Sequence, residues 1–202
     1  DGLRALAVIC VIINHFNKEL LPSGYLGVDI FFVISGYVIT SSLSGRKSKS
    51  FWELAGGFYE RRLKRIIPAL ISYTLIISLL LCLFCDEPVL LLRTGITSLF
   101  GISNIYLLRQ STNYFADSTS LNPFTHTWSL SVEEQFYLVF PLLVWITGLG
   151  KQSKNSYRNL CLTLSLASIS SLIAFIYIYH VNQSAAYFLM PTRVWEISIG
   201  CL

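Results

Sequence analysis

Charged residues are scarce in this chain of 202 residues, of which 13% are charged and 53% are hydrophobic. Soluble domains carry about 25% charged residues, so the composition excludes an ordinary soluble domain and indicates a membrane protein. The mean hydropathy of +0.59 agrees with this class. The net charge of +4 gives no reason to expect nucleic-acid binding, because the basic residues cluster beside apolar segments.

The chain also lacks a cysteine pattern that could hold a metal. Its five cysteines lie in or beside apolar runs. Cys82 and Cys85 form a CxxC pair, but no second pair or nearby histidine completes a ligand set. We interpret the cysteines as small packing residues and assign no metal ligand. No internal repeat or low-complexity tract is visible.

What the chain does contain is a series of long apolar segments. A spanning helix needs about 20 largely apolar residues. Five segments meet or approach this length, namely 3–21, 25–43, 66–84, 130–149 and 159–181. A sixth begins near residue 194. The sequence therefore predicts an all-α, polytopic transmembrane bundle. We expect residues 1–202 to be the N-terminal part of one membrane domain, because the chain starts without methionine and stops inside an apolar segment.

The charge of the loops predicts the orientation of the spans. The loop after the second span carries seven basic residues, namely Arg46, Lys47, Lys49, Arg61, Arg62, Lys64 and Arg65. We expect this loop to be cytoplasmic, with Arg4 near the cytoplasm and His15 in the outer half of the first span. The second basic loop, GKQSKNSYR, lies on the same side only if segment 88–108 is re-entrant. We favour that arrangement over a spanning 88–108.

Ionisable residues inside the apolar segments mark a candidate site. Arg4 and His15 are eleven residues apart, so a helix places them on one face, about 16 Å apart along its axis. Asp29 lies about one turn inside the second span, at a depth close to that of His15. This suggests a pair in which the carboxylate orients the imidazole; a purely structural hydrogen bond is the alternative. Ser35 and Gly36 are typical of close packing between helices.

Three arginines stand at the start of the third span, in FYERRLKRIIP. On a helix Arg61, Arg62 and Arg65 can converge on one polyanion, because guanidinium groups form paired hydrogen bonds with phosphate oxygens. Basic clusters beside a membrane are equally typical of topology signals and of contacts with lipid headgroups. The residues alone leave both interpretations open.

The segment HTWSLSVEEQFYLVFP is the densest group of polar residues. Glu133 and Glu134 suit a helix start by dipole alone, but we expect one of them to face the bundle near the depth of His15. A helix cap with an interfacial aromatic belt is the alternative. Further along, Arg193 and Glu196 are three residues apart, which predicts an ion pair within one helix.

Taken together, these segments resemble the membrane-bound acyltransferase 3 family, typified by bacterial O-antigen and peptidoglycan O-acetyltransferases. The matching pieces occur in family order: DGLRALAVICVIINH, GYLGVDIFFVISGYVI, FYERRLKRIIP, HTWSLSVEEQFYLVFP and PTRVWEISIG. The resemblance implies about ten spans, of which this chain would hold the first six or seven. Some members carry a further extracytoplasmic hydrolase-like domain.

The resemblance implies transfer of an acyl group, commonly acetyl, from acyl-CoA to a hydroxyl, most often on a sugar. In the family the histidine matching His15 is held to be essential, together with the arginine matching Arg4. The arginines matching Arg61, Arg62 and Arg65 are associated with the donor. We therefore expect acetyl-CoA as a donor substrate with no resident cofactor, and an acceptor glycan such as lipopolysaccharide or peptidoglycan. The expected location is the bacterial inner membrane.

On this hypothesis His15 acts as general base or as a transient acyl carrier. A carboxylate, that of Asp29, Glu133 or Glu134, would orient it. Arg4 would hold the donor or stabilise charge on the thioester oxygen. A transporter is the main alternative, because charges inside spans also build proton and solute pathways. A non-catalytic membrane anchor is a third.

Overall fold

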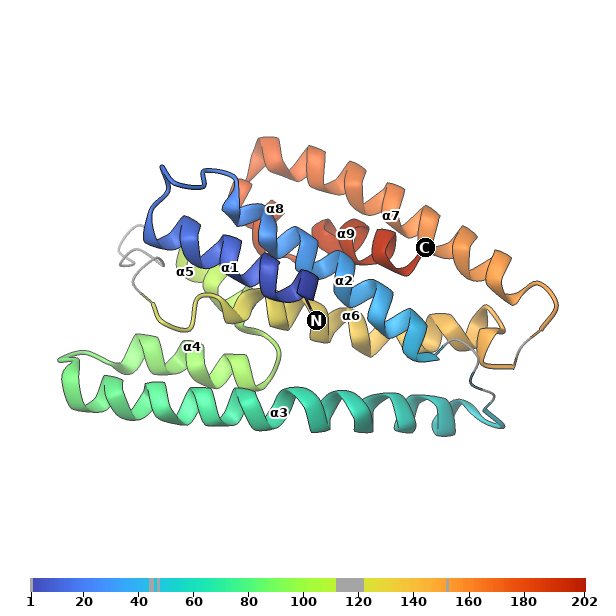
Figure 1. The fold of residues 1–202 in the computed structure, drawn as a ribbon, viewed down its shortest axis with the longest axis horizontal. Coiled ribbons are helices and arrows are strands. Elements are labelled where there is room, and N and C mark those ends of the chain that lie inside the picture. The colour runs from blue at the N-terminus through green and yellow to red at the C-terminus, as the bar shows by residue number, and fades with distance from the viewer. Residues whose placement is uncertain (1, 44–45, 47, 112–121, 152) are drawn as a thin grey trace.

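Helices make up all the regular structure of the described residues, which are 2–43, 46, 48–111, 122–151 and 153–202 of the computed structural model. The helices are, in order, α1 (Gly2–Phe16), η1 (Gly24–Leu26), α2 (Gly27–Leu43), α3 (Phe51–Phe84), α4 (Val89–Leu99), α5 (Ser103–Ser111), α6 (Thr127–Ile146), η3 (Leu149–Lys151), α7 (Ser156–Val181), α8 (Gln183–Phe188) and α9 (Met190–Cys201). The longer helices follow the long axis of the molecule (Figure 1).

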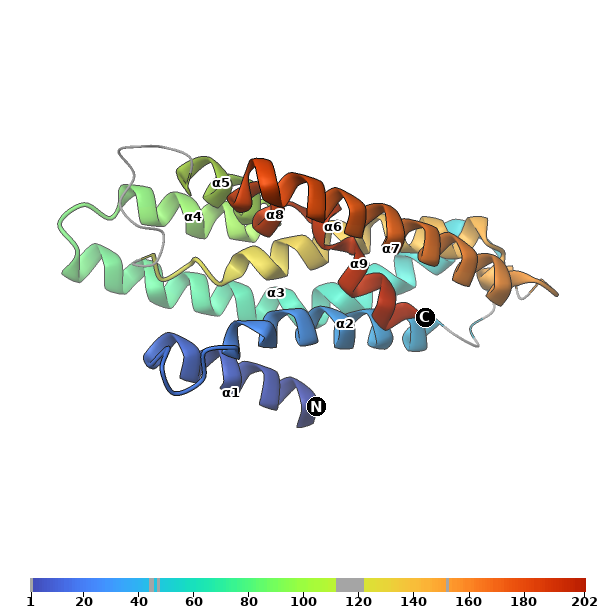
Figure 2. The same cartoon turned by 90° about the horizontal axis from the view of Figure 1, so that it is seen from above.

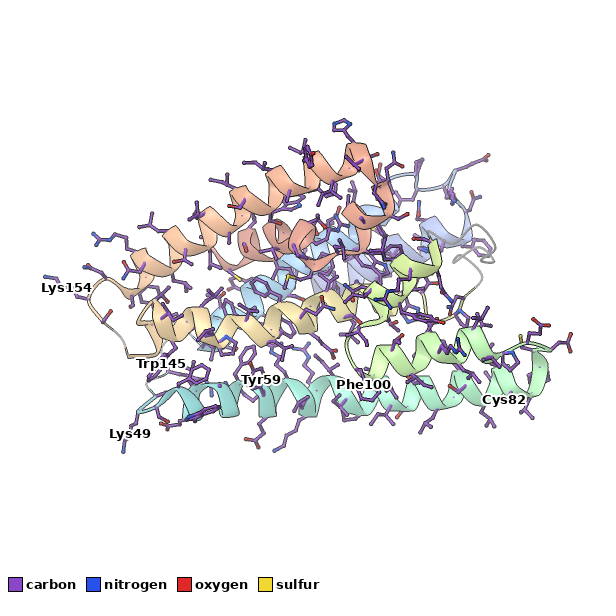
Figure 3. The ribbon with its side chains drawn as sticks, turned by 180° about the vertical axis from the view of Figure 1, so that it is seen from behind. Lys49, Tyr59, Cys82, Phe100, Trp145 and Lys154 are labelled. Atoms are coloured by element: carbon purple, nitrogen blue, oxygen red, sulfur yellow. The ribbon has the colours of Figure 1, made fainter. Side chains whose placement is uncertain are left out.

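The two ends of this long axis differ in charge. Lys49, just before α3, and Lys154, just before α7, lie at the same end (Figure 3). We call this the basic end. The opposite end, here the far end, carries the connection from α1 to α2 and the last turns of α3, near Cys82 (Figures 1 and 3). The two basic loops therefore share one side of the bundle, as the loop charges predict.

Four of the described helical segments are long and apolar enough to cross a membrane: Gly24–Leu43, Phe51–Phe84, Thr127–Ile146 and Ser156–Val181. This confirms the all-α membrane fold. Within their most apolar stretches, 44% of the residues of α6 are buried, against 11% in α3 and in α7. Helix α6 is thus the centre of the bundle, whereas α3 and α7 present most of their apolar side chains to the outside, where lipid would cover them.

The first apolar segment forms a shorter helix than the predicted span 3–21. Helix α1 ends at Phe16 after 15 residues, because the next residues make a hydrogen-bonded turn. The Asn14 side-chain nitrogen donates to the carbonyl oxygens of Leu21 (2.8 Å) and Pro22 (3.2 Å). Helix α1 begins near the middle of the long axis and ends at the far end (Figures 1 and 2). The first turn of α1, which carries Arg4, is therefore nearer to the basic end than its last turn, which carries His15. The cytoplasmic side of Arg4 stays a prediction.

Helix α3 also departs from the prediction, which places a loop before residue 66. It is one continuous helix of 34 residues, about 51 Å long. The Ser50 hydroxyl caps its start by accepting a hydrogen bond from the Glu53 backbone N–H at 3.2 Å. The arginines of FYERRLKR are consequently helical and lie about 15–21 Å beyond its first residue. They therefore stand on the helix itself and not in a loop before it, and each faces a direction set by the helix rotation.

Segment 88–108 forms a helical hairpin and not a single span. Helix α4 enters from the far end, and α5 returns toward that end (Figures 1 and 2). Phe100, in the turn, lies near mid-length of α3 (Figure 3). Gly101 makes this turn with a φ of +65°, a left-handed conformation that glycine adopts without strain. This hairpin agrees with the re-entrant arrangement. The hairpin allows both basic loops to lie at one end.

Helices α2 and α9 cross with their backbones almost touching. A Cβ on Gly36 would overlap the Ile197 carbonyl, and one on Gly200 would overlap the Val33 carbonyl. Small residues at such crossings are typical of membrane helices, where close packing replaces the hydrophobic effect. This close crossing brings polar side chains of α2 within reach of α9.

Candidate active site

Glu133 is a buried carboxylate at the centre of the bundle, with 4% of its surface exposed. It projects from α6 between two hydroxyl groups. The Ser35 hydroxyl donates to Oε1 at 2.7 Å, and the Tyr137 hydroxyl donates to Oε2 at 2.8 Å. Each carboxylate oxygen therefore has one neutral hydroxyl donor, which fixes the carboxylate without an ion-pair contact.

Two guanidinium groups flank this carboxylate. Arg4, from α1, and Arg62, from α3, are both near enough for their charges to act on Glu133. The guanidinium carbon of Arg62 lies 5.4 Å from the centroid of the Tyr137 ring and 5.7 Å from that of Phe58. That of Arg4 lies 5.8 Å from the Phe31 ring. Such cation–π contacts suit cations held away from water.

We call Arg4, Ser35, Arg62, Glu133 and Tyr137 the central polar cluster. The sequence predicts Arg4, Arg62 and Glu133 as site residues, and the structure brings these three together. Tyr137 is missed, although its position four residues after Glu133 is a usable signal, since residues i and i+4 share a helix face. The sequence analysis interprets Ser35 only as a packing residue. Its hydrogen-bond partner, Glu133, is 98 positions away, and the sequence around Ser35 gives no sign of it.

A second cluster of charges joins α2 to α9. Arg193 donates to Glu196 Oε1 at 2.5 Å and to Asp29 Oδ1 at 3.1 Å. Arg193 and Glu196 are 5% and 1% exposed, respectively. Four aromatic rings surround the guanidinium at 5.2–5.9 Å, those of Phe32, Trp128, Phe175 and Tyr187. We call Asp29, Arg193 and Glu196 the ion cluster. The predicted pair within α9 is thus confirmed, and Asp29 is its third member.

The predicted pair of His15 and Asp29 does not form among the described residues. Asp29 is held by Arg193, across the close crossing of α2 and α9. His15 is exposed near the end of α1, and its Nδ1 lies 2.9 Å from the Val11 carbonyl oxygen. A carbonyl oxygen only accepts hydrogen bonds, so this contact requires a proton on Nδ1, and in the neutral imidazole Nε2 then has the lone pair. The backbone of α1, and not a carboxylate, orients the imidazole.

His126 belongs to the same region as His15. Surrounding atoms that exclude water lower the pKa of His126 below its usual value, and His15 is near enough to add to this effect. The ring centroid of His126 lies 5.1 Å from that of Tyr73, whose hydroxyl donates to the Pro123 carbonyl at 2.7 Å. His126 caps the start of α6. Residues of α1, α3 and α6 therefore meet beside His15.

Glu134 lies apart from the central polar cluster. Its carboxylate packs against the turn between α4 and α5, where a Cβ on Gly101 would overlap Glu134 Oε2. The next residue, Gln135, donates to the Gly101 carbonyl at 2.9 Å. Buried hydroxyl groups continue this polar contact between the hairpin and α6, namely Ser98, Ser103, Thr127 and Ser131. Of the two predicted glutamates, Glu133 faces the centre and Glu134 supports the hairpin.

The three predicted arginines of α3 do not converge on one point. Arg62 faces the central polar cluster. Arg65 is exposed, and its charge acts on Arg62. Arg61 lines a separate cavity at the basic end, together with Arg46. Consecutive residues project about 100° apart on a helix, which explains why Arg61 and Arg62 face different surroundings.

Ionisable residues enclosed between apolar helices define the class, a polytopic membrane protein with a polar interior. Over residues 1–202 the chain matches the family model described as acyltransferase domain, the acyltransferase 3 family, and it belongs to that family. It is 40% identical over 205 residues to the O-acetyltransferase OatA of Staphylococcus aureus (strain NCTC 8325 / PS 47). It is 36% identical over 210 residues to a putative O-acetyltransferase of S. aureus (strain COL).

Both matches cover 100% of this chain and 33% of the relative, so the chain spans about a third of the length of these proteins. No solved structure matches the chain.

Proposed function

We propose that this chain is part of a membrane O-acetyltransferase that takes an acetyl group from acyl-CoA on the cytoplasmic side. The acceptor is a hydroxyl of a cell-envelope glycan, and sugar hydroxyls of peptidoglycan and of lipopolysaccharide are the two acceptor classes to test. Membership of the acyltransferase 3 family supports this proposal, as do relatives that are named O-acetyltransferases. The basic end would face the cytoplasm, and the bacterial inner membrane would hold the protein.

The orientation of His15 is the observation that carries the proposed chemistry. Because Nδ1 donates to the Val11 carbonyl, Nε2 has the lone pair that a general base requires. His15 Nε2 would take the proton of the acceptor hydroxyl while its oxygen attacks the thioester carbonyl. Collapse of the tetrahedral intermediate breaks the carbon–sulfur bond. The thiolate of coenzyme A leaves and takes the proton back from the imidazolium.

The same lone pair also permits a carrier mechanism. His15 Nε2 would attack the thioester carbonyl and hold the acetyl group as an acyl-imidazolium that keeps its Nδ1 proton, with loss of the coenzyme thiolate. The acceptor hydroxyl would then attack this intermediate, and its proton would go to the thiolate or to water. In both routes the Val11 carbonyl keeps the imidazole in place, which is the role the sequence assigns to Asp29, Glu133 or Glu134.

Arg4 would connect the donor to His15. It starts the same helix, about 16 Å from His15 along the axis, and it lies with Arg62 beside Glu133. A donor entering from the basic end would pass these two cations before its thioester approaches His15. Cations placed there would stabilise negative charge on the thioester oxygen, which grows in the transition state. Glu133 would hold the cations in place and would not itself touch the imidazole.

Replacing His15 with Ala or Gln in the full-length protein tests this proposal. We expect acetyl transfer to fall to background, measured as loss of acetyl-CoA thioester and as acetylated glycan, with normal membrane insertion. His180→Gln is the matched control, because His180 is an exposed histidine in the last turn of α7. Normal acetylation by the His15 variants would refute the mechanism. Substrate flux without thioester cleavage in the unaltered protein would instead indicate a transporter.

A further inference from the structure

His126 is a second histidine in the region where α1 ends. It stands at the start of α6, and the end of α1 and the start of α6 both lie toward the far end of the molecule (Figures 1 and 2). His15 is near enough to influence the protonation of His126. Imidazoles from two helices therefore border one region of the protein, and the proposed acetyl transfer uses only that of His15.

The two imidazoles are held in the same way. The backbone of Pro123 forms a hydrogen bond with the His126 ring, and because proline has no N–H, the acceptor is its carbonyl oxygen. The Tyr73 hydroxyl donates to the same carbonyl at 2.7 Å, and the centroids of the Tyr73 and His126 rings are 5.1 Å apart. The Val11 carbonyl is the corresponding partner of His15. Each ring is thus fixed by a backbone carbonyl, and both side chains are exposed.

The His126 side chain does not cap the helix that it starts. Residue 126 is at the N-cap position of α6, but its side chain makes no capping hydrogen bond, which is the usual structural role of a polar side chain there. The nitrogen that donates to a carbonyl carries the proton of a neutral imidazole, and the other nitrogen then has a lone pair. Atoms that exclude water from part of the ring lower the pKa of His126 and so favour this neutral form. His126 therefore meets the requirements of a general base.

We propose that His126 is a second catalytic residue, which takes the proton of the acceptor hydroxyl while His15 holds the acetyl group. This inference rests on the carrier route of the proposed function. In that route Nε2 of His15 is bonded to the acetyl carbon and Nδ1 keeps its proton, so the ring has no lone pair left to act as a base. A base for the second step must come from another group, and a neutral imidazole near His15 is suited to it.

Atoms and electrons balance in this second step. The O–H bond of the acceptor breaks, its proton goes to His126, and its oxygen attacks the acetyl carbonyl carbon. The bond from this carbon to His15 Nε2 then breaks, and the electron pair returns to the nitrogen. His126 passes its proton to water, and the coenzyme thiolate from the first step takes a proton from water. Each of the two imidazoles is cationic only while the other is neutral, which avoids repulsion between neighbouring charges.

Single-turnover kinetics of the full-length protein, with acetyl-CoA and a glycan acceptor, test this division of roles. For His126→Gln we expect coenzyme A release in the first turnover at an unaltered rate. Glycan acetylation should be slower by about 100-fold or more, the usual range for loss of a general base. Mass spectrometry of rapidly quenched samples should then find acetylated His15 accumulating. His180→Gln, a change to an exposed histidine of α7, is the control and should alter neither rate.

Two results of these kinetics would overturn the proposal. One is glycan acetylation by His126→Gln at the unaltered rate, which would show that no proton passes through His126. The other is equal slowing of coenzyme A release and of glycan acetylation, because a purely structural defect would affect both steps.

Chemical rescue separates a base from a structural contact. His126→Ala leaves room for a small molecule beside His15. We expect free imidazole to restore part of the glycan acetylation by this variant, because it accepts the proton in place of the side chain. Pyrrole, a ring of the same shape without a basic nitrogen, should restore none. No recovery with imidazole, or equal recovery with pyrrole, would contradict the role of His126 as a base.

Cross-linking without substrate tests the geometry alone. In the full-length protein with His15→Cys and His126→Cys, a short bismaleimide should link the two cysteines, as identified by mass spectrometry of the linked peptides. His15→Cys with His180→Cys is the control, because α7 lies on the other side of the molecule from α1 (Figure 2). Absence of a link between residues 15 and 126 would overturn the shared site and leave the proposed function intact. A link between them, together with an unaltered protein that transfers no acetyl group, would refute the proposed function and not the geometry.

Discussion

The central polar cluster and the ion cluster both bury a carboxylate near a guanidinium, yet they satisfy it differently. Glu133 receives its hydrogen bonds from the hydroxyls of Ser35 and Tyr137. Arg193 bonds directly to Glu196 and Asp29, while its Nε and Glu196 Oε2 have no hydrogen-bond partner among the described residues. A direct ion pair fixes two helices to each other, whereas hydroxyl donors hold a carboxylate and leave nearby cations to act at longer range.

The contrast assigns different roles to the two clusters. The ion cluster lies at the crossing of α2 and α9 and is enclosed by aromatic rings, as expected of an element that fastens the fold. The central polar cluster gathers residues from α1, α2, α3 and α6, and its member from α1, Arg4, stands on the same helix as His15. We therefore expect changes in the ion cluster to affect mainly stability, and changes in the central polar cluster to affect mainly activity.

Arg193→Met is expected to have the largest effect on stability. It would leave the buried carboxylate of Glu196 and the half-buried one of Asp29 without their cation, and breaking a buried ion pair in this way costs about 3–5 kcal/mol. Thermal unfolding of the purified protein, followed by size exclusion, measures the loss. The triple variant Asp29→Asn, Arg193→Met and Glu196→Gln removes all three charges and should recover most of the stability. A triple variant as unstable as Arg193→Met would show that charge balance is not what matters here.

Gly200→Ala should also break the ion cluster, although it removes no charge. Its Cβ would overlap the Val33 carbonyl, so α2 and α9 must move apart and stretch the 3.1 Å bond between Arg193 and Asp29. Overpacking of this kind typically costs about 1–3 kcal/mol. Gly56→Ala is the control, since its Cβ would meet no atom within 4 Å. Equal melting temperatures of the two variants would contradict the close crossing.

Tyr137→Phe tests the central polar cluster with a smaller change. It removes the hydroxyl that donates to Glu133 Oε2 at 2.8 Å and leaves that oxygen buried without a donor, at a cost of about 1–3 kcal/mol. Since Arg62 stacks on the same ring, the ring itself should keep the cation in place. We expect kcat to fall severalfold or more, whereas the melting temperature should change by only a few degrees. A variant with a lower melting temperature but full kcat would show that the central polar cluster stabilises the fold and does not act in catalysis.

Protonation of His126 should have the smallest effect on the free energy of unfolding, and only at acidic pH. Its pKa in the folded protein is lowered, mainly by surroundings that exclude water, so the unfolded chain binds more protons. Stability is then fully present above the unfolded pKa of about 6.5 and falls as the pH drops below it. Unfolding of the unaltered protein and of His126→Gln between pH 5 and 8 measures this. A parallel pH dependence in both proteins would rule out His126 as its source.

The sequence by itself determined the membrane class, the sites of α2, α6 and α7, and the grouping of both basic loops on one side. These are local properties, since the length of an apolar run and the charge of a loop can be read without knowing the neighbours. It also singled out Arg4 as an ionisable residue inside an apolar helix and Glu133 or Glu134 as facing the bundle, because such residues are costly there, and it predicted the ion pair of Arg193 with Glu196.

Only the tertiary structure determined which charged side chains pair with each other. Asp29 pairs with Arg193 across 164 positions, and not with His15 on the adjacent helix, because the glycines of α2 and α9 let those backbones touch. Likewise, the unbroken helix α3 separates Arg61 from Arg62, directing one to the basic end and the other to Glu133. Partners that lie far apart in sequence depend on how helices cross and rotate, and no local pattern encodes that.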